Sequence, residues 1–155
     1  GGLHLFRNIS RGVILQTQYF PVIEFNESKE DVVTPKELVL SGYNFFGEGD
    51  MESLSKLYHK DALIKVNGDH ELSGEYRGFD DFLNNFLAQI PTKFPNFDLN
   101  ILNVTAEQDR VFVNVHYKAD NLDAQSVHMF VVEDGLQTEF RLVDDSQKIA
   151  KALSS

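Results

Sequence analysis

A histidine stands at the centre of an apolar stretch of the sequence, in "SVHMFVVEDGLQTEFR" at residues 126–141. Imidazole is the side chain whose ordinary pKa lies closest to neutral pH, so it is well suited to give or take a proton. His128 alternates with Phe130 and Val132, and alternate residues of a strand share one face. Two interpretations stay open. His128 is an acid or base in a pocket, or it is a core residue bonded to a backbone carbonyl.

Other polar side chains could act beside a pocket histidine. Glu139 and Arg141 lie two residues apart on the next strand pattern, so they share a face and can form an ion pair. That pair belongs either to a pocket or to an exposed strand surface. Tyr43 offers a hydroxyl from a helical pattern, as a donor or as a core aromatic. His116 falls opposite the valine-rich face of residues 110–118, which places it outside the core.

The residue types argue against several other kinds of site. The chain has no cysteine, which excludes a thiol nucleophile and a Cys-ligated metal. No two of its five histidines are spaced i, i+2 or i+4, so we expect no metal site. The glycines of "GEGD" at 47–50 are not followed by the lysine of a phosphate loop. We therefore expect no cofactor.

Charge narrows the choice of partners. The formal net charge is −10, whereas nucleic acid and anionic membranes both attract basic patches. The apolar run at 13–15 is broken by polar residues, so it forms neither a signal core nor a spanning helix. We expect a cytoplasmic protein whose partner is a small molecule of unknown identity. The chain opens on Gly-Gly, which leaves a preceding targeting segment open.

The elements that would position these side chains begin with helices. With 155 residues the chain suits a single domain. "TPKE" at 34–37 is a capping box with proline at the first helical position, which predicts a helix ended by Gly47 and Gly49. A second helix capped by Asp50 would carry Tyr58 on its apolar side. A strand is predicted at 62–66.

The second half of the chain is predicted to be mostly strand. A third helix should end at Pro91. Alternation then predicts four strands and a terminal helical turn, at 97–104, 110–118, 124–132, 138–143 and 146–153. This order predicts an α+β fold, with helices on one face of a curved antiparallel sheet that closes over them as a cone. A small-molecule pocket is expected at the mouth of the cone.

Two motifs in the sequence are similar to motifs of a known protein family. "GEYRGFDDFL" at 74–83 and the H-x-F-x-x-x-D-G run at 128–135 resemble the SnoaL-like, ketosteroid-isomerase-related branch of the nuclear transport factor two-like superfamily. The resemblance covers about residues 36–153. It implies a cystatin-like α+β barrel, a strongly curved sheet wrapped around three N-terminal helices, with a domain at 34–155 and an N-terminal extension at 1–33. This superfold hosts isomerases, cyclases, hydrolases and non-catalytic binding modules.

The resemblance also assigns positions. The base of the steroid isomerases falls at Val66, which cannot take a proton, and their tyrosine donor falls at Gly42, one residue before Tyr43. Their neutral carboxyl falls at His128. The resemblance implies His128 and Tyr43 as catalytic residues if the protein is an enzyme, and excludes steroid isomerase activity. The expected pocket lining is Tyr58, Val66, Phe82, Phe86, Phe130, Glu139 and Arg141.

Two functions remain open at this stage. One is acid–base chemistry of the isomerase, cyclase or hydrolase kind through His128, on a small and largely apolar ligand. The other is a non-catalytic module for ligand binding or dimerisation. Either face of the strand at 124–132 is apolar, so the face turned away from the helices should need a cover. We expect a two-fold homodimer, with residues 12–25 ordered against the sheet or the partner.

Overall fold

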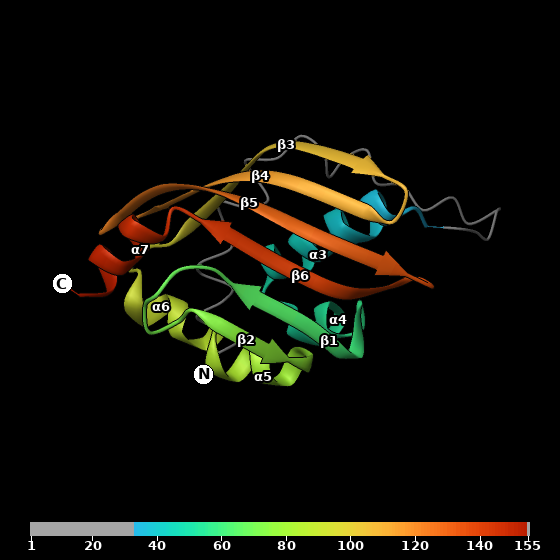
Figure 1. Ribbon diagram of the computed structural model, residues 1–155, viewed down its shortest axis with the longest axis horizontal. Coiled ribbons are helices and arrows are strands. Elements are labelled where there is room, and N and C mark those ends of the chain that lie inside the picture. The colour runs from blue at the N-terminus through green and yellow to red at the C-terminus, as the bar shows by residue number, and fades with distance from the viewer. Residues whose placement is uncertain (1–32, 155) are drawn as a thin grey trace.

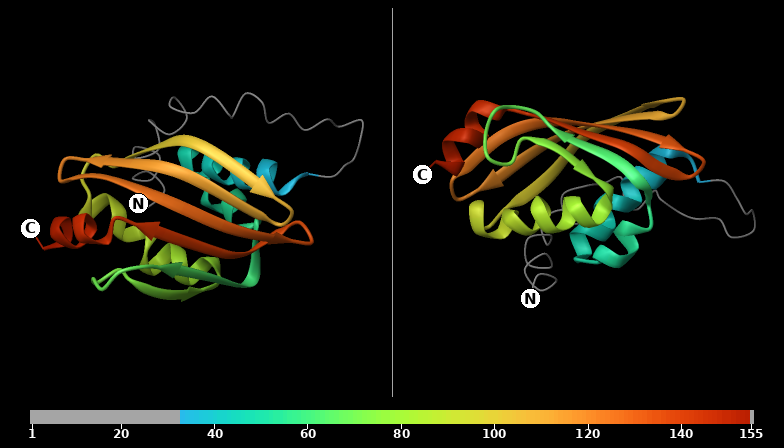
Figure 2. Two further views of the ribbon diagram at one scale, coloured as in Figure 1. Left: turned by 45° about the horizontal axis from the view of Figure 1, so that its top comes forward. Right: turned by 60° about the horizontal axis from the view of Figure 1, so that its bottom comes forward.

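The computed structural model describes residues 33–154 (Figure 1). A curved six-stranded sheet covers helices that gather on one of its faces (Figure 2). This arrangement confirms the predicted α+β class and the cone-like curvature, and the sheet remains open at its edges. The elements in chain order are α3 (Pro35–Glu48), α4 (Met51–Ser55), β1 (Tyr58–Val66), β2 (Gly74–Arg77), α5 (Gly78–Asn85), the 3₁₀ helix η2 (Leu87–Gln89), α6 (Ile90–Lys93), β3 (Asp98–Glu107), β4 (Arg110–Ala119), β5 (Leu122–Glu133), β6 (Leu136–Asp144) and α7 (Ser146–Leu153).

The strands run in the order β2-β1-β6-β5-β4-β3. All neighbours are antiparallel except β1 and β6, which are parallel, so the expectation of a wholly antiparallel sheet was wrong at this one pair. The four strands predicted from alternation correspond to β3–β6. Strand β2 was not predicted, because four residues carry too short a pattern to be recognised.

The first helix begins as its capping box predicts. The Thr34 hydroxyl accepts from the Glu37 backbone N–H at 3.1 Å, and the Glu37 carboxylate accepts from the Thr34 N–H at 2.9 Å. Gly49 ends the helix with a left-handed φ of 74°, which glycine adopts without a steric penalty.

Two predictions about the other helices were wrong. Tyr58 does not lie on the second helix but begins β1, where it pairs with Gln137 of β6. Sheet pairing therefore overrides the helical spacing of this residue. Pro91 does not end the third helix. It lies in the first turn of α6, where a missing N–H costs no hydrogen bond.

The inner face of β4 packs toward the helices. Val111, Val113 and Val115 are fully buried. His116 points to the other side, where its Nε2 lies 2.7 Å from an Asp123 carboxylate oxygen. The prediction that the valines face the core and His116 lies outside is confirmed.

Candidate functional site

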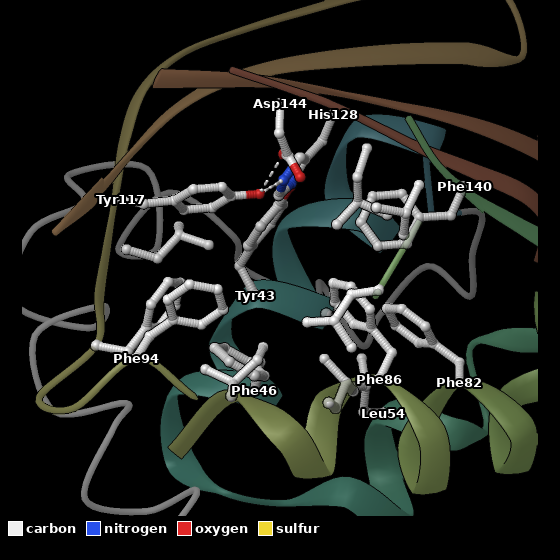
Figure 3. Close-up of a pocket in the computed structure, with 18 of the residues that line it drawn as sticks. Tyr43, Phe46, Leu54, Phe82, Phe86, Phe94, Tyr117, His128, Phe140 and Asp144 are labelled. Carbon is white, nitrogen blue, oxygen red and sulfur yellow. Dashed lines mark hydrogen bonds between the residues drawn. The ribbon is translucent and has the colours of Figure 1, made fainter. Parts of the chain in front are cut away.

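A cavity of about 100 Å³ lies between the sheet and the helices. Its walls are largely aromatic, because seven phenylalanines of residues 33–154 line it, on helices and strands alike. Figure 3 shows several of these rings around the lower part of the cavity, and a group of polar side chains together at one end. The phenylalanines are Phe46, Phe82, Phe86, Phe94, Phe97, Phe130 and Phe140.

His128 lies on the inner face of β5, lines the cavity and is only 3% exposed. Both of its ring nitrogens meet tyrosine hydroxyls. Nδ1 lies 2.6 Å from the Tyr43 oxygen, and Nε2 lies 2.6 Å from the Tyr117 oxygen. Neither interpretation drawn from the sequence is complete, since His128 is buried at a cavity wall and its partners are side chains from α3 and β4.

The polar chain continues to a partly buried carboxylate. The Tyr117 hydroxyl donates to Asp144 Oδ1 at 2.9 Å, and the Ser126 hydroxyl donates to the same oxygen. Because Tyr117 has only one proton to give, its oxygen must accept from His128, which places the imidazole proton on Nε2. Nδ1 then accepts from Tyr43. We name this set of hydrogen-bonded side chains the polar relay. Its members are Tyr43, His128, Tyr117 and Asp144.

Burial sets the protonation states along the polar relay. Desolvation lowers the pKa of His128 to about 3, so the ring is neutral at physiological pH. Desolvation also raises the pKa of Asp144, although the hydrogen bonds from Ser126 and Tyr117 oppose that rise. The pKa values of Tyr43 and Tyr117 are raised well above their usual value, chiefly by burial and then by nearby charge. Asp144 is therefore the group of the polar relay best suited to accept a proton.

The model of the SnoaL-like domain family matches residues 39–140, which is more than half of the chain. The chain belongs to the SnoaL-like domain family. No curated protein matches it significantly.

Solved structures share the fold of this SnoaL-like domain. An NTF2-like protein from Burkholderia thailandensis E264 is 16% identical with a TM-score of 0.73, over 79% of this chain and 98% of its own. TerC, co-crystallised with polyporic acid, is 23% identical with a TM-score of 0.67, over 79% and 100% of the two chains. A putative SnoaL-like polyketide cyclase from Jannaschia sp. CCS1 is 20% identical with a TM-score of 0.65, over 82% and 97%.

Several residues expected in the pocket of the SnoaL-like domain line the cavity. They are Tyr58, Val66, Phe82, Phe86 and Phe130. Glu139 and Arg141 do not line it. Glu139 is partly exposed and Arg141 is exposed. The two side chains form an ion pair on the outer face of β6. Their place in a pocket was therefore wrong, because alternation against the inward Phe140 and Leu142 turns both charges outward.

Two members of the polar relay were missed from the sequence. Asp144, to which no role was assigned from the sequence, is partly buried and lines the cavity. It alternates with Phe140 and Leu142, so strand parity carried a signal for it. Tyr117 lies on the inward, valine-rich face of β4, and no role was assigned to it from the sequence.

Residues 33–154 contain no group of three or more His, Asp or Glu side chains placed to hold a metal ion. Across the same residues, no helix combines the length and the apolar character needed to span a membrane. The predicted role of residues 12–25 lies outside the described residues.

Proposed function

We propose that this SnoaL-like protein catalyses proton transfer on a small, largely apolar ligand that carries a carbonyl or enol group. The observation that carries the proposal is the polar relay, which connects a tyrosine at the cavity wall to a partly buried carboxylate through two hydrogen bonds of 2.6 Å and one of 2.9 Å. Enzymes of this kind place groups of shifted pKa in an otherwise apolar pocket.

The proton moves along the polar relay without placing a positive charge on the histidine. The ligand gives its proton to the Tyr43 oxygen while the Tyr43 proton passes to Nδ1 of His128. The Nε2 proton passes to Tyr117, whose own proton passes to Asp144. Each intermediate group gains and loses one proton, so the ligand becomes an anion and the carboxylate becomes neutral. The reverse sequence returns the proton to another atom of the ligand.

This direction of transfer fits the electrostatics of the site. An imidazole whose pKa is about 3 is a weak base alone, but it can pass a proton between its two nitrogens. The raised pKa of Asp144 favours its protonated form. Tyr43, once it has received the ligand's proton, can donate a hydrogen bond to the oxygen on which negative charge develops.

Two structural relatives support a small-molecule ligand. TerC was crystallised with polyporic acid, and the Jannaschia protein is described as a putative polyketide cyclase. Both share the fold with this chain at 20–23% identity. Chemistry of the isomerase or cyclase kind fits the polar relay better than hydrolysis, because the relay transfers protons and supplies no nucleophile.

Hydrogen–deuterium exchange tests the proposal without a known substrate. Acetophenone is a small, largely apolar ketone, and proton NMR in D₂O follows the loss of its methyl protons. We expect the protein to accelerate the exchange above a buffer control. His128→Gln and Asp144→Asn should each lower the rate by about 10²- to 10⁴-fold.

The matched control is His116→Gln, which changes the histidine on the outer face of the sheet and should leave the rate unchanged. Exchange at the buffer rate, with saturable binding of acetophenone to the cavity, would favour the second candidate function. That function is a non-catalytic ligand-binding module, and the largely apolar cavity wall is the observation that supports it.

The same proposal includes a homodimer formed through the outer face of the sheet. Among the described residues, four large apolar side chains of that face are 37–51% exposed: Leu102, Phe112, Val127 and Val143. Met129 and Val131, which alternate with Val127, are covered within the single chain. Light scattering at micromolar concentration should give twice the chain mass of 17.6 kDa, and Phe112→Lys should shift the mass toward the monomer. A wild-type mass of 17.6 kDa would refute the dimer.

A further inference from the structure

Gln137 is a polar side chain that the polar relay does not use. It lies near the start of β6, is 1% exposed and lines the cavity. Its backbone N–H donates to the Leu57 carbonyl at 2.7 Å, but its side-chain Nε2 and Oε1 make no hydrogen bond of ordinary geometry within the described part of the chain. The Tyr58 hydroxyl, from the paired position on β1, lies close enough for the amide to oppose the rise that burial causes in the pKa of Tyr58. The backbone N–H of Gln137 is therefore paired, and the groups without a partner are those of its side-chain amide.

An unpaired buried amide is unfavourable, so such groups in proteins nearly always find a partner. The primary amide offers two donors on nitrogen and an acceptor on oxygen. Because the Tyr58 hydroxyl approaches the amide without a hydrogen bond of ordinary geometry, a molecule in the cavity can supply the partners that the described residues do not. The ligand therefore needs an acceptor and a donor side by side.

Gly42 of α3 keeps the space beside this amide open. A Cβ atom at Gly42 would lie 3.9 Å from Gln137 Oε1, and 3.4 Å from a methyl carbon of both Leu54 and Leu57. Glycine within a helix is unfavourable relative to alanine, yet Gly42 lies inside α3 with no positive φ to require it. The missing side chain leaves room at the Gln137 amide for an atom of another molecule.

The charge of the cavity wall decides between a neutral and an anionic ligand group. Among the described residues that line the cavity, none is Lys or Arg, and Asp144 contributes an acidic side chain. A carboxylate would find no counter-charge there and would lose its hydration. A carboxamide or lactam stays neutral, and it presents a carbonyl beside an N–H.

We infer that Gln137 is the specificity-determining residue of the cavity and that it selects a neutral ligand with a carboxamide-type group on a ring-sized apolar body. The ligand carbonyl accepts from Nε2, and the ligand N–H donates to Oε1. The inference rests on the proposed function in one respect, which is that the cavity holds a ligand at all. It adds the chemical class of a second group on the ligand, besides the one that reacts at the polar relay.

Benzamide and acetophenone form a matched pair of probes. They have nearly the same size and both carry a carbonyl, but acetophenone has a methyl group where benzamide has its NH₂. NMR titration of ¹⁵N-labelled protein gives both Kd values and follows the side-chain amide signal of Gln137 directly. We expect benzamide to bind at least about tenfold more tightly than acetophenone, and to shift that signal.

Gln137→Met keeps the length of the side chain and removes the amide. This variant should bind both probes with similar Kd, whereas Gln125→Met, on the exposed face of β5, should keep the preference for benzamide. The Tm of Gln137→Met without ligand should equal or exceed that of the wild type, because an unpaired amide is removed. A lower Tm would show that the amide is paired inside the protein, and would overturn the inference.

Equal Kd values for the two probes on the wild-type protein would also overturn it, as would no binding of benzamide or a preference that survives in Gln137→Met. The outcome is independent of the proton-transfer proposal, since Asp144→Asn should abolish exchange and keep the preference for benzamide. A preference without any exchange would refute the catalytic proposal alone. Exchange without a preference would refute the role of Gln137 alone.

Discussion

The buried imidazole of His128 should make the protein less stable as the pH falls. Its pKa is about 3 in the folded protein and 6.5 when exposed, so the unfolded chain binds one more proton between these values. Stability therefore rises with pH across that window, and is lost as the pH falls from 6.5 toward 3. Proton linkage then lowers the free energy of unfolding by about 1.4 kcal/mol between pH 7.5 and pH 5.5. At pH 4 the loss grows to about 3 kcal/mol.

The comparison with His128→Gln isolates this contribution. Asp144 and His70 also have shifted pKa values, and the raised pKa of Asp144 acts in the opposite direction to that of His128. Both groups are present in the wild type and in the variant, so their contributions largely cancel in the difference. Glutamine keeps one donor and one acceptor for the two tyrosine hydroxyls.

Urea unfolding at each pH gives the free energy of unfolding of both proteins. The advantage of the wild type over His128→Gln should shrink by about 1.4 kcal/mol from pH 7.5 to pH 5.5. His116→Gln serves as the control, because this residue lies on the outer face of the sheet, and it should not reproduce that change. Wild-type and His128→Gln stabilities that fall in parallel would show that the imidazole is not held neutral by burial.

Three further outcomes can be measured on the same protein. Tyr117→Phe removes the link between His128 and Asp144. The free energy of unfolding in urea should fall by about 1–3 kcal/mol, and the exchange of acetophenone protons should fall to the buffer rate. Wild-type values for both would contradict the polar relay. Thr34→Ala removes the helix cap and should lower the free energy of unfolding by about 1 kcal/mol, whereas an unchanged midpoint would show that the cap is not needed. A steroid enone should show no turnover above buffer by absorbance, because Val66 offers no base where the steroid isomerases have one; clear turnover would disprove this.

The sequence predicted the fold well because its local signals agree with one another. Thr34 and Pro35 mark the start of α3, and alternation defines the long strands β3–β6. The inward position of His128 also follows from parity. The resemblance also named Tyr43 beside it. Tyr117 and Asp144 did not follow as its partners, because they come from separate strands that only the tertiary fold brings together with His128.

Gln137 shows a different limit of sequence reasoning. The pairing of β5 with β6 shifts register between Val131 and Val132, so Gln137 and Phe140 both face inward although they lie three residues apart. Strict alternation from Phe140 would turn Gln137 outward. A bulge of this kind reverses the parity of a strand, and its position depends on the partner strand rather than on local sequence.

The parallel pairing of β1 with β6 has a consequence for how the protein folds. Hairpin-like neighbours close short loops, as β3–β4, β4–β5 and β5–β6 do, whereas the pairing of Leu63 with Glu139 closes a loop that spans half of the chain. The chain loses conformational entropy when that loop closes, and it does so before the contacts between β1 and β6 stabilise it. The pairing of β1 with β6 should therefore form late. Tyr58 and Gln137 sit at that junction. The wall of the cavity that carries the unpaired amide is therefore completed only when the two halves of the sheet join, and substitutions there should change the unfolding rate more than the folding rate.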